Sequence, residues 1–355
     1  MQQNSTVLDS LRAVAVTLVL LDHLVETIGA ASSPISIRIA WQLGRLGVIL
    51  FFVHTTYVLM MSMQRRGLTG PTLVKDFYVR RGFRIYPLAL AAVATVILFG
   101  IPRTPWSGIH PELTPVTVLS NVLLVQDLTS APALLGPMWS LSPEVLMYLA
   151  LPFLFLIVRA RPLWSTVAAL WFCAVIVAVV AESSGAPQLS VAYFAPCFMS
   201  GVVAFWARER REGSWPFWAW ALSLSSIIAL YLGIGTLSKE VHVAAAAWCC
   251  CLLMGVLLPG FAETGSRAVR VTSHVVAKYS YGIYLGHMIA LWLAFSLLSE
   301  WPRVAQWGVF AAVMVALPYA AYHLIEEPLI QIGNRVAGLV TRPRLPDLLP
   351  DISGN

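Results

Sequence analysis

Long apolar runs recur along the whole chain, and they constrain its fold more than any other feature. Of the 355 residues, 58% are hydrophobic and 11% are charged, whereas an ordinary soluble domain has about 25% charged residues. Such a chain cannot cover itself with polar surface, and runs of about 17 to 25 apolar residues are long enough to cross a bilayer as helices. The sequence therefore predicts an all-α, polytopic membrane protein.

Ten runs have the length of a transmembrane helix. Between the third and fourth runs lies a Pro-rich connection, residues 101–137, which is too long for a simple turn. Its middle is expected to form a short interfacial or re-entrant helix. The ten expected spans are roughly 8–28, 44–63, 85–101, 139–158, 164–181, 190–207, 216–235, 241–260, 279–299 and 304–325.

The basic residues predict the orientation of these spans. Of the 23 lysines and arginines, 17 fall on one side of the membrane and five on the other, and Arg12 lies inside the first span. Because cytoplasmic loops carry the excess of Lys and Arg, both termini are expected in the cytoplasm. This distribution accounts for the net charge of +6, and no nucleic-acid partner is expected.

The chain is expected to form one membrane domain, residues 1–335, followed by a short cytoplasmic tail, residues 336–355. Its five cysteines lie within apolar runs and follow no disulfide or zinc pattern, so no metal site is expected. No Lys or Arg precedes Arg12, which argues against a cleaved signal peptide. No internal repeat is visible.

The first run, LDSLRAVAVTLVLLDHLVETIG (8–29), carries ionisable side chains on one face. Arg12 and His23 differ by about 20° around a helix and lie about 16 Å apart along it. Glu26 follows His23 by three residues and shares its stripe. Ionisable groups at bilayer depth cost about 2.5 to 3.5 kcal/mol each, so they face a protein interior or a wet cavity. The stripe predicts a lined site, and buried interhelical pairing is the alternative.

The residue types suggest different roles within this stripe. A neutral imidazole takes a proton from a hydroxyl near neutral pH, so His23 is the candidate general base, with Glu26 or Asp22 fixing its tautomer. Arg12 remains charged and suits binding an anion or a developing oxyanion.

Six motifs follow one another along the chain, beginning with the pair formed by Arg12 and His23, which are separated by ten residues. The other five are RLGVILFFVHTTYVLM (45–60), FYVRRGFRIYPLAL (77–90), MWSLSPEVLMYLALP (138–152), YSYGIYLGH (279–287) and HLIEEP (323–328). In this order they resemble the acyltransferase-3 family of integral membrane acyltransferases, and the resemblance covers nearly the full chain.

The resemblance implies transfer of an acyl group, commonly acetyl, from cytoplasmic acyl-CoA to a hydroxyl, usually on a carbohydrate or glycosylated acceptor. Acyl-CoA would be a co-substrate, with no permanently bound cofactor. In the family the histidine and arginine of the first helix are required, and they match His23 and Arg12. The pattern of Arg, two residues, Arg matches Arg81 and Arg84 and is linked to acyl-CoA. We expect a multi-pass protein of a bacterial inner (plasma) membrane.

Charge and spacing support a phosphate-binding role for Arg80, Arg81 and Arg84. Coenzyme A carries a pyrophosphate and a 3'-phosphate, and positions i, i+1 and i+4 place at least two guanidinium groups on one helix face. The alternative is that these arginines only anchor the topology.

Further candidates could form an acceptor site or have only structural roles. Ser142 and Pro143 are predicted as the N-cap and first residue of a helix, which places Glu144 in its first turn. Many family members read FFVLSGF where this chain has FFVHTTY (51–57), so His54 adds a second intramembrane imidazole. On a helix, Ser280, Tyr284 and His287 share one face, and Glu326 or Glu327 matches a family acid.

A transporter or flippase is the alternative function, because buried Arg, His and Glu also serve proton-coupled transport. Such a protein would more often show inverted repeats or paired broken helices, and the sequence has neither. A non-catalytic scaffold would leave the stripe of Arg12 and His23 unexplained.

Overall fold

The computed structural model describes residues 5–29, 33–102, 111–210, 214–237, 240–264 and 266–341. Within these ranges the chain is helical, with one isolated β-bridge between Trp215 and Phe261. The long helices are α1 (Thr6–Thr27), α2 (Pro34–Arg66), α3 (Gly70–Phe99), α6 (Leu141–Ala160), α7 (Trp164–Ser184), α8 (Ala195–Arg208), α9 (Phe217–Leu237), α10 (Glu240–Leu257), α11 (Arg267–Leu291), α12 (Arg303–Ala321) and α13 (Glu327–Val340). The prediction of an all-α fold is confirmed.

Nine helical segments within the described ranges are long and apolar enough to cross a membrane. The first of the nine is α2, and α1 does not belong to the set, although its 22 residues are sufficient for a span. Charged side chains on α1 explain the difference, because they lower its apolar character without shortening it. With α1 included, the count agrees with the expected ten.

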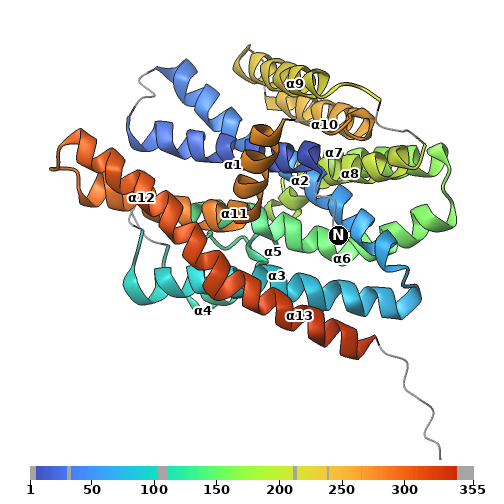
Figure 1. Cartoon of the computed structure of the whole chain (residues 1–355), viewed down its shortest axis with the longest axis horizontal. Helices are drawn as coiled ribbons and strands as arrows, with labels where there is room; N and C mark the ends of the chain where they lie inside the picture. Colours follow the sequence, from blue (N-terminus) through green and yellow to red (C-terminus); the bar gives the residue numbers. More distant parts are fainter. Residues whose placement is uncertain are drawn as a thin grey trace, which may run out of the picture.

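Helix α1 lies between α2 and α11, with α2 as its most extensive neighbour (Figure 1). Two glycines of α2 allow the close approach. A Cβ atom at Gly44 would lie 1.9 Å from Asp22 Oδ2, and one at Gly47 would lie 2.5 Å from the carbonyl oxygen of Ala15. Small residues commonly permit such contacts between membrane helices.

Two helices begin well before the apolar windows that predicted them. Helix α2 begins at Pro34 instead of near residue 44, because Ser33 forms a capping box with Ser36 and Pro34 occupies the first turn. Helix α3 begins at Gly70 instead of near residue 85. The windows mark the apolar part of each helix, and both helices continue through polar sequence beyond it.

The Pro-rich connection contains the helical structure expected in its middle, in the form of α4 (Pro115–Leu123) and α5 (Gln126–Thr129). Buried side chains fold it back on itself. Asn121 Nδ2 donates to the carbonyl of Pro132, and Asn121 Oδ1 accepts from the amide of Leu134, each at 2.9 Å. Gln126 donates to the carbonyl of Met138 at 2.8 Å. The connection thereby holds the 3-10 turn η1 (Gly136–Ser140) at the start of α6.

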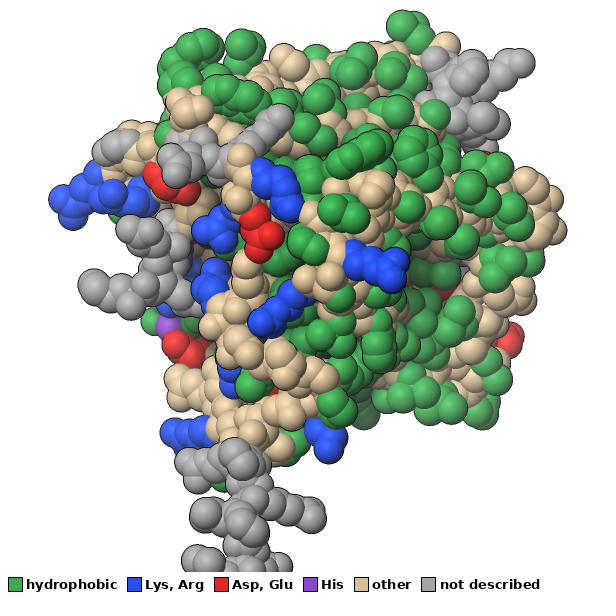
Figure 2. Space-filling model, turned by 90° about the vertical axis from the view of Figure 1, so that its right-hand side faces the viewer, with side chains coloured by type: hydrophobic (Ala, Val, Ile, Leu, Met, Phe, Trp, Pro, Cys, Tyr) green, Lys and Arg blue, Asp and Glu red, His purple; other side chains and the backbone are tan. Residues whose placement is uncertain are grey.

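The last expected span continues beyond residue 325 through the π-helical turn η5 (Tyr322–Glu326) into α13. Helix α13 packs along α3 (Figure 1). The predicted start of the tail, residue 336, lies within α13, and residues 342–355 lie outside the described ranges. Figure 2 looks onto the end of the molecule that is at the right in Figure 1, and Lys and Arg side chains gather on part of this end.

Candidate active site

His23 on α1 and His287 on α11 face each other. Their rings stack with centroids 5.2 Å apart and an interplanar angle of 25°. His287 is 1% exposed, and its Nδ1 lies 3.2 Å from the carbonyl oxygen of Ile283. If that nitrogen donates to the carbonyl, Nε2 carries a free lone pair, and this atom is buried without a hydrogen-bond partner. His287 therefore presents a buried ring nitrogen that is free to accept a hydrogen bond inside the bundle.

Glu26 is the carboxylate placed beside His23. Its Oε2 lies 3.5 Å from His23 Nδ1, which is within ion-pair range but too long for a good hydrogen bond. Asp22 is turned away from this contact and packs against Gly44 of α2. Of the two acids considered as partners of His23, the structure brings Glu26 to it.

One turn before His287, Tyr284 joins α11 to η1. The Tyr284 hydroxyl donates to the carbonyl of Pro137 at 2.7 Å and lies 2.6 Å from Ser140 Oγ. Ser140, Tyr284 and Glu144 line a small cavity of about 30 Å³ between α1, α2, α6 and α11, which has room for about two water molecules. The α1 residues that line it lie between Arg12 and His23 in the sequence.

Glu144 lies in the first turn of α6, as predicted, and is 9% exposed. The predicted N-cap was wrong: α6 begins at Leu141 after Ser140, because η1 leads directly into the helix. Ser142 Oγ instead accepts a weak bond from the amide of Asp127 at 3.4 Å. Glu144 accepts a short hydrogen bond from Tyr148, one turn later on α6.

Arg12 lies at the other end of the α1 stripe. Its Nε donates to Ser280 Oγ at 2.6 Å, and its guanidinium carbon lies 5.3 Å from the centre of the Phe51 ring. His54 is 5% exposed and interacts electrostatically with Arg12. His54 Nδ1 is buried without a hydrogen-bond partner. The second intramembrane imidazole therefore belongs to the Arg12 end of the stripe.

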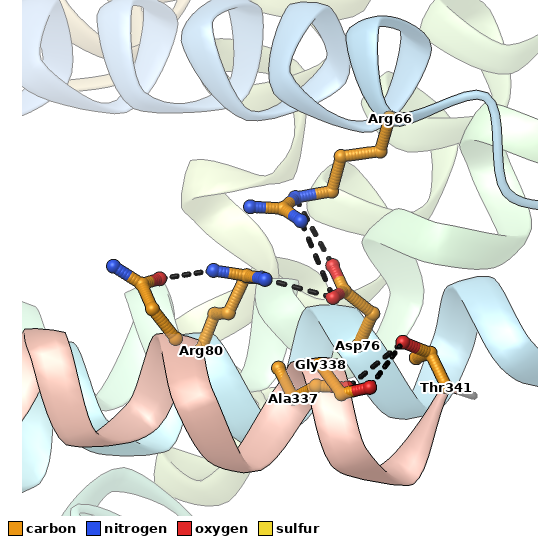
Figure 3. Close-up of polar contacts among 7 residues, drawn as sticks. Arg66, Asp76, Arg80, Ala337, Gly338 and Thr341 are labelled. Carbon is orange, nitrogen blue, oxygen red and sulfur yellow. Dashed lines mark hydrogen bonds and ion pairs between the residues drawn. The ribbon is translucent and has the colours of Figure 1, made fainter.

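Arg80 is held by a polar network on the side of α3 that faces α13 (Figure 3). Asp76, one turn earlier, lies between Arg80 and Arg66, with ion-pair distances of 2.9 and 3.1 Å. Arg80 also donates to Asn334 of α13. Asp76 is 2% exposed, so this network joins α2, α3 and α13 at the end of the bundle.

Arg84 and Arg81 point to different neighbours. Arg84 Nη1 lies 2.5 Å from Glu326 Oε2 in a partly buried ion pair with η5. Arg81 has no ion pair or hydrogen bond within the described part of the chain, and it interacts electrostatically with Glu144 and Tyr148. Arg81 is thus the arginine of this cluster whose donors remain available. Between the two family acids, Glu326 is the buried one, whereas Glu327 pairs with His323.

The candidate residues form two groups, one towards each end of α1, and the members of each group contact or interact with one another. His23, Glu26, Tyr284 and His287 lie at one end of α1. Arg12, His54, Glu144, Arg81, Arg84 and Glu326 lie towards the other end, while Arg80 belongs to the network around Asp76. The separation of Arg12 and His23 along α1 is about 16 Å at 1.5 Å per residue. No cluster of three His, Cys, Asp or Glu side chains suited to a metal occurs in the described ranges.

Sequence reasoning did not identify Tyr148, Ser140 or Asp76. Two of them had a usable signal, because Asp76 and Arg80 are four residues apart, as are Glu144 and Tyr148, and such pairs meet on one face of a helix. Ser140 had none, because its contact with Tyr284 joins residues 144 positions apart.

The fold and this buried array are those of an integral membrane protein with a polar interior, and comparison with known proteins identifies the class as a membrane acyltransferase. A family model described as an acyltransferase domain matches residues 6–323. The chain therefore belongs to the acyltransferase-3 family. Acyltransferase MdmB of Streptomyces mycarofaciens is 26% identical over 351 residues, with 85% of this chain and 84% of the relative covered. No solved structure matches the chain.

Proposed function

We propose that this membrane acyltransferase transfers an acetyl or similar acyl group from acyl-CoA to a hydroxyl of a carbohydrate or glycosylated acceptor. One observation carries the proposal: Tyr284, one turn from the stacked pair of His23 and His287, lines the same small cavity as Glu144, which interacts electrostatically with Arg81. The pair supplies a base for a hydroxyl, and the arginine suits a phosphate. The chain would reside in a bacterial plasma membrane, in line with its spans and its Streptomyces relative.

The donor would bind from the end of the molecule where basic side chains gather. Arg81 would bind a phosphate of coenzyme A, because a guanidinium forms paired hydrogen bonds with phosphate oxygens. Arg84 is held in place by Glu326 and adds positive charge beside Arg81. The pantetheine arm would then extend along α1 towards His23.

Arg12 is better placed to bind the donor than to stabilise charge on the reacting carbonyl. It lies about 16 Å from His23 along the helix axis, and its neighbours include Glu144, Arg84 and Glu326. We assign it the role of holding the donor chain or its charged end, with Ser280 fixing the orientation of its guanidinium.

Transfer would begin when His23 Nε2 accepts the proton of the acceptor hydroxyl. The hydroxyl oxygen forms a bond to the thioester carbonyl carbon, the carbon–sulfur bond breaks, and the departing thiolate takes the proton back from the imidazolium. The products are an ester and free coenzyme A. Glu26 would move closer than its present 3.5 Å to accept a hydrogen bond from His23 Nδ1–H, and the stacked His287 ring would fix the orientation of the His23 ring.

Transfer of label from radiolabelled acetyl-CoA to a panel of sugar acceptors tests this function in membranes that contain the protein. His23→Ala and Arg81→Gln should reduce the label transferred at matched expression. His323→Gln and Arg159→Gln are the matched controls, because both residues lie outside the array. Equal transfer by His23→Ala would overturn the mechanism. No transfer by the wild-type protein with any donor and acceptor would favour the transporter.

A further inference from the structure

A second, larger cavity lies away from the donor route. Its volume is about 420 Å³, it is open on one side, and it is lined by residues of α2, the end of α7, the 3-10 segment η2 (Pro187–Phe194) and α10. This volume falls within the range of about 300 to 1,000 Å³ that is typical of small-molecule sites. Trp41, Gln42, Arg45, Glu182, Tyr193 and Phe194 supply its aromatic and polar lining.

The lining combines flat apolar surfaces with one oriented cation. The Arg45 guanidinium carbon lies 5.3 Å from the centre of the Trp41 ring and 4.6 Å from that of Tyr193. No carboxylate lies within ion-pair distance of Arg45 in the described ranges. Stacking on two rings fixes the position of the guanidinium while its N–H donors remain available.

Two polar atoms of residues that line this cavity are buried without a hydrogen-bond partner in the described part of the chain. Gln42 is 2% exposed and lines the cavity, yet its Oε1 has no partner. The hydroxyl of Tyr193, also in the lining, has none either. Leaving such groups unpaired costs about 1 to 3 kcal/mol each, so a bound ligand that supplies donors and acceptors would recover this energy.

The cavity lies towards the start of α2, whereas the basic residues Arg65 and Arg66 lie in the last turn of this helix. Arg45 and Arg65 are 20 residues apart on this helix, which corresponds to about 30 Å at 1.5 Å per residue, the thickness of a bilayer core. A ring contact links the linings of the two cavities: Phe194 lines the large cavity, Phe52 lines the small one, and their centroids are 5.5 Å apart.

We propose that this large cavity binds the sugar ring of a neutral glycoside and delivers its hydroxyl past Phe194 and Phe52 to the small cavity. The proposal rests on the acyl transfer proposed above and names the acceptor side of that reaction. Aromatic rings pack on the apolar face of a sugar, while Gln42, Arg45 and Glu182 match its hydroxyls. Coenzyme A is a poor fit to this cavity, because Arg45 is the only Lys or Arg among the described lining residues and the acidic Glu182 also lines it.

Photolabelling tests the site without requiring catalysis. The full chain in lipid nanodiscs would be irradiated with a set of alkyl-diazirine hexosides, and the adducts mapped by peptide mass spectrometry. Adducts within residues 41–45 or 187–194, suppressed by excess methyl hexoside, are the expected result. The absence of adducts in both segments with every probe would overturn the proposal.

Kinetics with acetyl-CoA and methyl hexosides provide the second test. Trp41→Ala should raise the acceptor KM about tenfold and leave the KM for acetyl-CoA within twofold. Trp218→Ala is the matched control, because Trp218 is a similarly exposed tryptophan outside the cavity. An unchanged acceptor KM in Trp41→Ala would overturn the acceptor site while the acyltransferase proposal stands. Labelling of the cavity without any acyl transfer would overturn the acyl-transfer proposal and keep the glycoside site.

Discussion

Arg84 on α3 and the buried Glu326 in η5 form an ion pair, with Arg84 Nη1 2.5 Å from Glu326 Oε2. The residues are 242 positions apart in the chain. Arg84 pairs with only one of the two carboxylate oxygens, because Glu326 Oε1 has no hydrogen-bond partner in the described part of the chain. The pair links the third helix to the π-helical turn before α13 and holds Arg84 beside Arg81.

Removing one member of this pair should destabilise the fold. Glu326→Ala leaves the partly buried Arg84 guanidinium without its counter-charge, and we expect a loss of about 1 to 3 kcal/mol in the free energy of unfolding. Denaturant unfolding in detergent measures this loss, with exposed Glu300→Ala as the control. The double variant Arg84→Gln with Glu326→Gln should recover part of the loss. Equal stability of Glu326→Ala and wild type would show that the pair contributes nothing.

Substitution of each stacked histidine should show which one is the general base and which one only positions it. His23→Phe keeps an aromatic ring but removes the proposed proton acceptor, so kcat should fall by about 10²- to 10⁴-fold. His287→Phe also preserves the ring contact and should reduce kcat less than tenfold, which is about 1.4 kcal/mol. The measurement is kcat for transfer from acetyl-CoA. If His287→Phe shows the larger loss, the base is His287.

Arg81→Gln should weaken donor binding specifically. A hydrogen bond to a charged group contributes about 1.5 to 3 kcal/mol, so the KM for acetyl-CoA should rise about 10- to 100-fold. Arg159→Gln removes an exposed arginine at the end of α6 and should leave this KM unchanged. Acetyl-dephospho-CoA, which lacks the 3'-phosphate, identifies the phosphate concerned. If Arg81 binds that phosphate, the variant should not distinguish the two donors.

Gly44→Ala should disturb the contact between α1 and α2. The added Cβ would overlap the Asp22 carboxylate, and overpacking of this kind costs about 1 to 3 kcal/mol. Gly308→Ala is the matched control in α12, because a Cβ there meets nothing within 4 Å. Thermal unfolding should show a lower midpoint for the first variant and an unchanged or higher one for the second. A midpoint for Gly44→Ala at or above the wild-type value would contradict the packing argument.

The features of the structure that the sequence predicted are those that depend on local periodicity. Apolar run length identified nearly all the membrane helices, and the eleven-residue spacing of Arg12 and His23 placed both on one face of α1. The helix ends were harder to predict, because capping and polar continuation extend α2 and α3 beyond their apolar parts. The N-cap of α6 was wrong because a 3-10 turn precedes the helix and moves its start to Leu141.

Contacts between distant segments could not be predicted from one sequence. The common face of Tyr284 and His287 on α11 was foreseen, but the stacking of His287 on His23 depends on how α11 packs against α1. The three arginines of α3, Arg80, Arg81 and Arg84, have different partners, and these partners come from α13, α6 and η5. The large cavity combines residues from α2, α7, η2 and α10, none of which is distinctive alone.

The edge contact between the rings of Phe52 and Phe194 also matters for the passage of water and protons through the protein. A continuous file of water between the two faces would let protons run down the membrane potential, which is worth about 2.3 kcal/mol per charge for each 100 mV. Two apolar rings between the small and the large cavity interrupt such a file at this point.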